Sequence, residues 1–286
     1  MRTAVYACAA LAAAMVAFPA PWARSQNQAP VRIIVGFAAG GTTDTAARLL
    51  AEAMKESLDE PVIVENKPGA SGRIAAETLK NAAPGGKTLL LVPIVVPVIA
   101  PLVFKQLSYD PVKDFAPITQ VANYQFGFLV GRDHPARTMA EFVSWAKSHP
   151  TQVSFGTPAA GSLPHFIGVM IGRAAGIDMV HIGYKGVAPL ATDLIGGQIP
   201  ASVDAVSDVI ELHRAGKLRI IATSGAQRSP LLPGVPTFKE QGFPDAEGSG
   251  WIAMYAPAKT SKPLIDKWST VIVKALRSSR RCVRRK

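Results

Sequence analysis

The chain has little cysteine, and its uncharged stretches are short. Only two of the 286 residues are cysteine, Cys8 and Cys282, close to opposite ends of the chain. A mature chain that starts after residue 25 therefore keeps one thiol and no internal disulfide. At this length a hydrophobic core, rather than covalent cross-links, is expected to hold the protein together.

Catalytic and cofactor signatures are missing or incomplete. NAAPGGKT at 81–88 lacks the first glycine of a phosphate loop, GFAAGG at 36–41 lacks the G-x-G of a dinucleotide fingerprint, and no G-x-S-x-G occurs. The five histidines have no metal-ligand spacing. We therefore predict no cofactor and no metal site. A triad of Ser162, His165 and an aspartate stays open as the enzymatic alternative.

The positive charge lies mostly at the chain ends. The formal net charge is +11, and the last eleven residues, LRSSRRCVRRK, contribute six of these charges. Arg2 and Arg24 contribute two more, which leaves +3 for the body. The body has no basic stripe interleaved with aromatic residues, so the charge does not indicate nucleic-acid binding.

Two uncharged stretches call for different explanations. Arg2, an alanine-rich segment at 4–22 and the small-x-small pattern ARS at 23–25 predict a cleaved secretory signal peptide over 1–25. The apolar stretch at 89–104 is interrupted by Pro93, Pro97 and Pro101. It is shorter than the roughly 20 residues of a membrane-spanning helix. We predict a buried strand, a proline-bounded turn and a short apolar helix there.

Strand-like and helical segments alternate through the body, which predicts an α/β fold of parallel sheets with helices on both faces. Ligands of such folds bind beyond the carboxyl ends of the strands. The expected strands are at 31–35, 62–65, 88–92, 126–130, 153–155, 179–182, 199–203 and 219–223, and the expected helices are at 43–58, 72–83, 139–148, 164–175, 188–195 and 206–215.

Four glycine-rich turns lead from strands towards helices. The first, at 36–43, ends at a helix that Thr42 or Thr43 can cap. Free N–H groups and the helix dipole favour an anion at such a terminus. The others are at 66–72, 155–165 and 184–186. Together they offer many backbone donors and few reactive side chains, which is typical of an anion receptor.

A series of motifs then occurs in a fixed order: VENKPGASG at 64–72, YDP at 109–111, DFAP at 114–117, GSLPH at 161–165, YKG at 184–186, DLIGG at 193–197, GKLR at 216–219 and VPT at 235–237. Over residues 31 to 276 the chain resembles the Bug family of periplasmic solute-binding receptors, which serve tripartite tricarboxylate transporters. The resemblance implies a two-lobed type II periplasmic-binding-protein fold with a ligand cleft between the lobes. It implies lobe 1 at 26–124 and 225–286, lobe 2 at 125–224, and crossings near 122–126 and 222–226.

The family resemblance also implies a ligand and its binding residues. The expected ligand is a small carboxylate, held by backbone amides and passed by a monomeric periplasmic receptor to transporter membrane subunits. The residues carried over from the family are Phe37, Gly40, Gly41 and Thr42 on one lobe and Gly156, Thr157, Ala160, Gly161 and Ser162 on the other. A bond from a backbone N–H to a carboxylate is charge-assisted and needs no counter-ion.

Several side chains have two interpretations. Asp204 follows a strand and either meets a ligand hydroxyl or amine or caps the next helix. His165 and Tyr184 are included as ligand contacts, although a structural role for His165 is favoured. Lys185 either attracts anions or is simply solvated. Asp44 and Arg48 are expected to pair with each other at i,i+4 spacing.

Two segments depart from the family pattern. Residues 93–101 are apolar where small polar residues are common, so a cleft lined by them would favour a ligand with an apolar or aromatic body. Residues 276–286 form an arginine-rich tail without helical periodicity. We read this as an altered C-terminus, which leaves a non-functional receptor as a further alternative.

Overall fold

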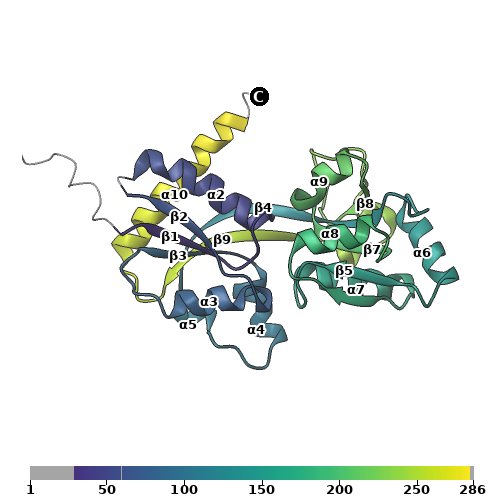
Figure 1. The fold of residues 1–286 in the computed structure, drawn as a ribbon, viewed down its shortest axis with the longest axis horizontal. Coiled ribbons are helices and arrows are strands. Elements are labelled where there is room, and N and C mark those ends of the chain that lie inside the picture. The colour runs from purple at the N-terminus through teal and green to yellow at the C-terminus, as the bar shows by residue number, and fades with distance from the viewer. Residues whose placement is uncertain (1–28, 59, 284–286) are drawn as a thin grey trace, which may run out of the picture.

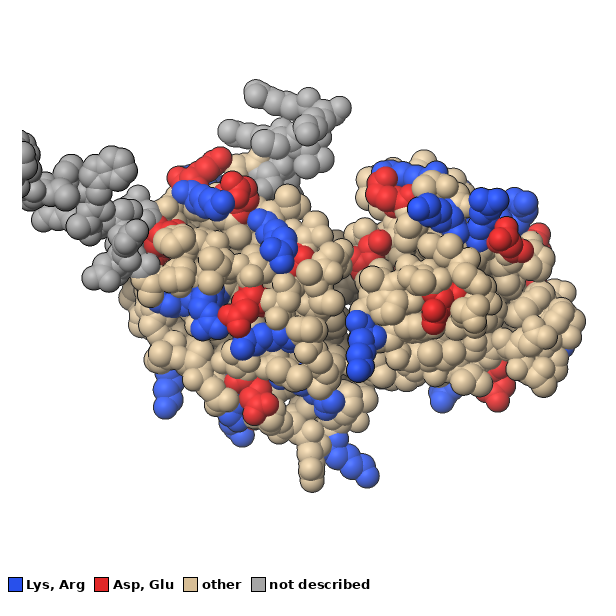
Figure 2. Space-filling view, viewed as in Figure 1, with Lys and Arg blue, Asp and Glu red and all other residues tan. Residues whose placement is uncertain are grey.

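Two lobes form the molecule, and two long strands run between them (Figure 1). The computed structural model describes residues 29–58 and 60–283, so the predicted signal peptide at 1–25 lies outside the described residues. In the space-filling view the lobes are two masses that meet at a narrower waist (Figure 2). The strands are β1 (Val31–Val35), β2 (Val62–Asn66), β3 (Thr88–Pro93), β4 (Phe115–Gly131), β5 (Ser154–Thr157), β6 (Val180–Gly183), β7 (Ala201–Ala205), β8 (Leu218–Thr223) and β9 (Ser249–Pro257).

The strands form one path in the order β2-β1-β3-β9-β4-β7-β5-β6, and β8 also pairs with β4. β1 is parallel to β2 and β3, and β5 is parallel to β6 and β7. β9 is antiparallel to β3 and β4, and β4 is antiparallel to β7 and β8. The α/β prediction is confirmed, but the sheets are mixed rather than parallel, because the strands that join the lobes run against their neighbours.

Helices cover both faces of each sheet, as their apolar stripes require. In the first lobe, Val31 and Ile33 pack with α2 and α10, whereas Ile34 points to the opposite face and packs with α3. In the second lobe, Phe128 packs with α6 and α7, and Leu129 packs with α8 and α9. The helices are α2 (Thr42–Met54), α3 (Arg73–Lys80), α4 (Ala100–Val103), α5 (Pro111–Asp114), α6 (Met139–Ser148), α7 (Leu163–Ala175), α8 (Val187–Ile195), α9 (Val206–Arg214) and α10 (Lys262–Val283).

β4 changes partners where the chain passes from one lobe to the other. Residues 115–125 pair with β9, and residues 126–131 pair with β7 and β8. Ser224 sits beside this point: its Oγ accepts from the amide of Phe126 at 2.9 Å and donates to the carbonyl of Gly248 at 2.6 Å. The change of partners lies within the predicted first crossing.

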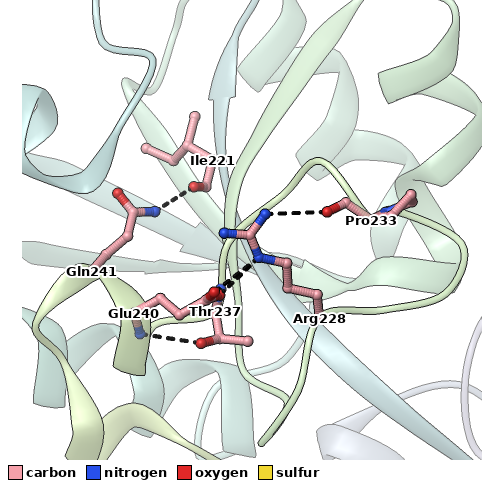
Figure 3. Close-up of polar contacts among 6 residues, drawn as sticks. All are labelled: Ile221, Arg228, Pro233, Thr237, Glu240 and Gln241. Carbon is pink, nitrogen blue, oxygen red and sulfur yellow. Dashed lines mark hydrogen bonds and ion pairs between the residues drawn. The ribbon is translucent and has the colours of Figure 1, made fainter.

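The predicted return crossing near 222–226 comes too early, and this corrects the boundary at residue 225. Phe238 and Phe243 pack in the α6–α7 core of the second lobe, and Leu232 packs with α8 and α9. Figure 3 shows how this loop is held: Arg228 pairs with Glu240 at 2.9 Å and donates to the Pro233 carbonyl. The loop therefore stays with the second lobe until β9 begins.

The apolar stretch at 89–104 folds as predicted. It forms the buried strand β3, a π-helical turn at Val95–Ile99 and the short helix α4. Among the described residues, no helix is long and apolar enough to cross a membrane.

The C-terminal segment is helical, contrary to the prediction that residues 276–286 have no pattern. α10 continues through Val283, the last described residue. Trp268, Ile272 and Ala275 of this helix are buried against the core that α2 also covers. These apolar residues, which mark the helical period, all precede residue 276. The arginine-rich end has no apolar periodicity of its own, although it continues the same helix.

Candidate ligand-binding site

A cavity of about 280 Å³ lies between the lobes. The first lobe contributes the glycine turn at 37–43 and the apolar residues 93–95. The second lobe contributes the turn after β5, the start of α8 and the junction between β7 and α9. Tyr124 and Phe126 of β4 lie in its wall. The sheet therefore brings strand-to-helix turns from both lobes to one place, as the α/β prediction implies.

Asp44 organises the first glycine turn. Its carboxylate accepts from the Gly40 amide at 2.9 Å, Arg48 Nε at 2.9 Å and Asn66 Nδ2 at 2.8 Å. Burial alone raises the pKa of Asp44, but these donors outweigh it and hold that pKa below its usual value. The predicted pairing of Asp44 with Arg48 is confirmed, and the acid serves the turn rather than the cavity.

The predicted residues of the first lobe all line the cavity: Phe37, Gly40, Gly41 and Thr42. Their amides are not all free, because the Gly40 amide is bonded to Asp44 and the Thr42 amide donates to Asp208 at 2.5 Å. Within the described part of the chain, the amides of Ala38, Ala39 and Gly41 donate to no protein acceptor. The same holds for the amides of Phe37 and Thr43, so five amides of this turn can donate to an anion.

On the second lobe the predicted turn residues separate into two groups. Ser162 lines the cavity together with Ala159. Neither amide donates to a protein acceptor among residues 29–58 and 60–283. Gly161 and Ala160 lie outside the lining. The Gly161 amide donates to His165 Nδ1 at 3.1 Å, and the Ala160 carbonyl accepts from Ser71 of the first lobe at 2.9 Å.

Gly156 and Thr157, both predicted as ligand contacts, lie outside the cavity lining and are packed within the second lobe. A Cβ on Gly156 would lie 2.3 Å from Leu190 Cδ1 and 2.7 Å from Ile199 Cδ1. Thr157 is fully buried, and its hydroxyl bonds to His181 Nε2 at 2.7 Å. Glycine is needed here because α8 lies directly against β5.

His165 and Tyr184, which were also predicted as ligand contacts, lie outside the cavity lining. His165 stacks on His181 with ring centroids 3.7 Å apart, and burial lowers the pKa of both imidazoles, that of His181 to about 4. The Tyr184 hydroxyl donates to Asp193 at 2.7 Å. Both side chains contact other residues of the second lobe rather than the cavity.

The enzymatic alternative lacks its geometry. The Ser162 hydroxyl donates to the Ala159 carbonyl at 2.6 Å, and His165 Nδ1 accepts from the Gly161 amide. A serine nucleophile needs a hydrogen bond to its base. Ser162 and His165 are instead each engaged with the backbone of the turn.

Asp204 lies in the cavity wall and is only 1% exposed. Its Oδ1 accepts from the Ala205 amide at 2.7 Å, and its Oδ2 is buried without a hydrogen-bond partner in the described part of the chain. No side chain caps α9, so the helix-cap interpretation is wrong. Burial, reinforced by the charge of nearby Asp208, raises the pKa of Asp204 well above its usual range.

Asp208 is a site residue that sequence reasoning missed. It lies in the first turn of α9 and lines the cavity. Its Oδ1 accepts from both the amide and the hydroxyl of Thr42, across the boundary between the lobes. No local sequence pattern marks this contact, because the two residues are 166 positions apart.

Much of the remaining wall is apolar. Pro93, Ile94 and Val95 line the cavity, so three residues of the stretch at 93–101 reach it. Phe37 and Leu163 add further apolar surface. Lys185 also lies in the lining, and its side chain is exposed. The cavity thus combines free backbone donors with an apolar wall and a lysine.

Two lobes, a cleft between them and convergent backbone donors define a solute-binding receptor rather than an enzyme. A family model described as "Tripartite tricarboxylate transporter family receptor" matches residues 46–281, and the chain belongs to this family. The predicted membership among the Bug-type receptors is thereby confirmed.

Individual relatives agree with this assignment. A UPF0065 protein from Cupriavidus necator is 35% identical over 94% of this chain and 82% of its own length. The periplasmic binding protein BugD is 34% identical, with a TM-score of 0.81, over 86% of this chain and 82% of its own. MatC from Rhodopseudomonas palustris, solved with bound malate, is 30% identical, with a TM-score of 0.81, over 86% of this chain and 84% of its own.

Proposed function

We propose that this protein is an extracytoplasmic receptor that binds a small organic carboxylate and delivers it to the membrane subunits of a tripartite tricarboxylate-type transporter. One observation carries the proposal: unpaired backbone amides from both lobes, at Ala38, Ala39 and Gly41 and at Ala159 and Ser162, line a single cavity. A carboxylate is the anion that MatC holds in the same fold.

The backbone donors suit a carboxylate for a physical reason. The turn at 37–41 leads directly into α2, so its amides and the helix dipole present positive potential to one place. Hydrogen bonds to an ionised oxygen are about twice as strong as neutral ones. A ligand that accepts hydrogen bonds from both lobes would stabilise the arrangement in which the lobes are closed around it.

The size and lining of the cavity restrict the ligand. A volume of about 280 Å³ lies near the lower end of small-molecule sites. The wall formed by residues 93–95 favours methylene groups or a ring behind the carboxylate. We therefore infer a compact acid with an apolar segment.

The cellular place of the protein is part of the same proposal. The predicted signal peptide at 1–25 would direct the chain to the periplasm, where receptors of this family capture their solutes. Since one receptor must hand over one ligand, the protein would act as a monomer. It would need no cofactor for this role.

The proposal is tested by a thermal-shift screen of the chain from residue 26 with malate, adipate, citrate, aspartate and benzoate. Binding to the folded state raises Tm by mass action. Ala188 lines the cavity at the start of α8 and is exposed, so Ala188→Trp should fill the space and abolish the shift. Ala174→Trp places the same ring on the exposed surface of α7 and should preserve it. No shift with any acid, or equal shifts in both variants, would reject carboxylate binding in this cleft.

A further inference from the structure

Two carboxyl groups share one wall of the cleft. Asp204 is the second-last residue of β7 and Asp208 lies in the first turn of α9, and both line the cavity from the second lobe. Neither forms an ion pair with any residue that the structure describes. An acidic wall is unexpected in a site for an anion, because two carboxylates would repel the ligand.

Asp204 and Asp208 accept different numbers of hydrogen bonds, and this difference indicates which of the two carboxyl groups is ionised. Asp208 accepts two donors from Thr42, its amide and its hydroxyl. Asp204 accepts one, the Ala205 amide on Oδ1, and its Oδ2 is buried with no hydrogen-bond partner among the described residues. Donors stabilise the ionised form. A single proton on the pair therefore resides on the group with fewer donors, which is Asp204.

Among the described residues, no cation pairs with Asp204. Tyr124 of β4 lines the same cavity, and its pKa is raised first by its own burial and then by the charge of Asp208. Lys185, before α8, is exposed on the lining. From the first lobe the pair meets Thr42, while Asp44 and Arg48 of α2 are paired with each other. Two neighbouring carboxylates in such a wall cannot both ionise at low cost.

We propose that Asp204 is the neutral member of this pair and donates its Oδ2 proton to an acceptor oxygen of the bound carboxylate. This rests on the proposed function, since it assigns a second contact within the same cleft. Asp208 stays ionised and holds Thr42. The ligand would then be selected for an acceptor oxygen that reaches Asp204, such as that of a second carboxyl group.

The proposal fixes how binding depends on pH. Once Asp204 loses its proton, an unpaired negative charge faces the anion and the donor is gone. The affinity for an anion should then fall by roughly tenfold per pH unit above the pKa of Asp204. A ligand ammonium group would do the opposite and bind more tightly to the ionised acid.

The protonation state can be measured without any ligand. Infrared spectra of the chain from residue 26 at neutral pH should show the carbonyl band of a buried carboxylic acid. Asp204→Asn should remove the band, and Asp178→Asn, the same change at an exposed position of the second lobe, should leave it. A spectrum without this band, or a band that survives Asp204→Asn, overturns the proposal.

The donor role is tested by calorimetric titration with malate and with adipate across about pH 5 to 10, a range that extends well above the neutral pH at which Asp204 is expected to be protonated. Asp204→Ala should lose roughly tenfold or more in affinity at the acid end, as expected for a lost bond to an ionised oxygen. Asp204→Asn, whose amide group also donates, should recover that loss and show no pH dependence. Asp178→Asn should follow the wild-type profile.

Other outcomes are equally decisive. Affinity that does not change with pH in the wild type, or Asp204→Asn that binds no better than Asp204→Ala, overturns the donor role while carboxylate binding stands. If neither malate nor adipate binds at any pH, and no other compound of the thermal-shift screen raises Tm, the proposed function fails. The infrared band alone then decides whether Asp204 is neutral.

Discussion

The amide of Thr42 donates to the carboxylate of Asp208 at 2.5 Å, which joins the N-terminus of α2 in one lobe to the first turn of α9 in the other. Thr42 also bonds to the Ser207 hydroxyl at 2.6 Å. A helix N-terminus is favourable for any anion. Here one of its donors already has a carboxylate from the protein itself, which holds the lobes together beside the cavity.

Loss of this contact should open the ligand-free protein. In Asp208→Ala the Thr42 amide loses its acceptor, and a bond to a charged group contributes about 1.5–3 kcal/mol. We expect a larger radius of gyration in small-angle scattering of the ligand-free variant. Asp178→Ala, at an exposed position of the same lobe, serves as the control. Identical scattering curves for wild type and Asp208→Ala would show that the contact does not hold the lobes.

A methyl group at Gly156 should lower stability, because the ends of the buried Leu190 and Ile199 side chains would have to shift. A Cβ there would lie 2.3 Å from Leu190 and 2.7 Å from Ile199. Overpacking of this kind costs about 1–3 kcal/mol, which lowers Tm by roughly 2–4 °C per kcal/mol in a chain of this size. Gly156→Ala should therefore melt earlier by calorimetry.

Gly85→Ala is the matched control for this variant, because a Cβ at Gly85 meets nothing within 4 Å. It should melt close to the wild type. A Gly156→Ala protein as stable as Gly85→Ala would mean that α8 can move away from β5 at little cost.

Asp44 should make stability depend on pH in the acid range. The donors around it hold its pKa in the folded state below the unfolded value. The stabilisation it provides is therefore complete above the unfolded pKa and is lost as pH falls through the folded one. Asp44→Asn should be less stable than wild type at neutral pH, and the difference should shrink on acidification.

Urea unfolding at several pH values measures this difference, and Asp133→Asn is the control because its side chain is 93% exposed. A deficit of Asp44→Asn that stays constant down to the acid limit would show that the donors bind a neutral group equally well.

Arg228 should hold the loop at 225–248 against the second lobe. It pairs with Glu240 at 2.9 Å and donates to the Pro233 carbonyl (Figure 3). Exposed pairs contribute at most about 1 kcal/mol, so Arg228→Ala should leave the global Tm nearly unchanged and speed hydrogen exchange within this loop. Arg214→Ala, which removes another exposed pair, that with Glu211, should leave the loop's exchange as in wild type. Unchanged exchange at 225–248 in Arg228→Ala would assign the loop's order to its buried Phe238 and Phe243 alone.

Local pattern accounts for much of the fold. The helix at Met139–Ser148 has the bounds that periodicity predicts, and β1, β3 and β8 lie within about a residue of their predicted ends. β9 and the first half of β4 were missed. Residues 115–125 of β4 are mostly half-buried, so no apolar run marks that half of the strand. β9 does contain an apolar run, at 251–256, which the sequence analysis did not assign. These strands exist because they pair with each other, and that pairing is not local.

The sequence by itself determined the family, the alternation of strands and helices and the position of the first glycine turn, because each rests on residues close together in the chain. Only the tertiary structure decided which amides remain free and which acids face the cleft. Gly156 and Tyr184 belong to motifs of the family, yet close packing of α8 on β5 and a bond to Asp193 take them out of the cavity. Asp208 belongs to no recognised motif, yet it meets Thr42 because burial of both sheets under their helices brings the ends of α2 and α9 together.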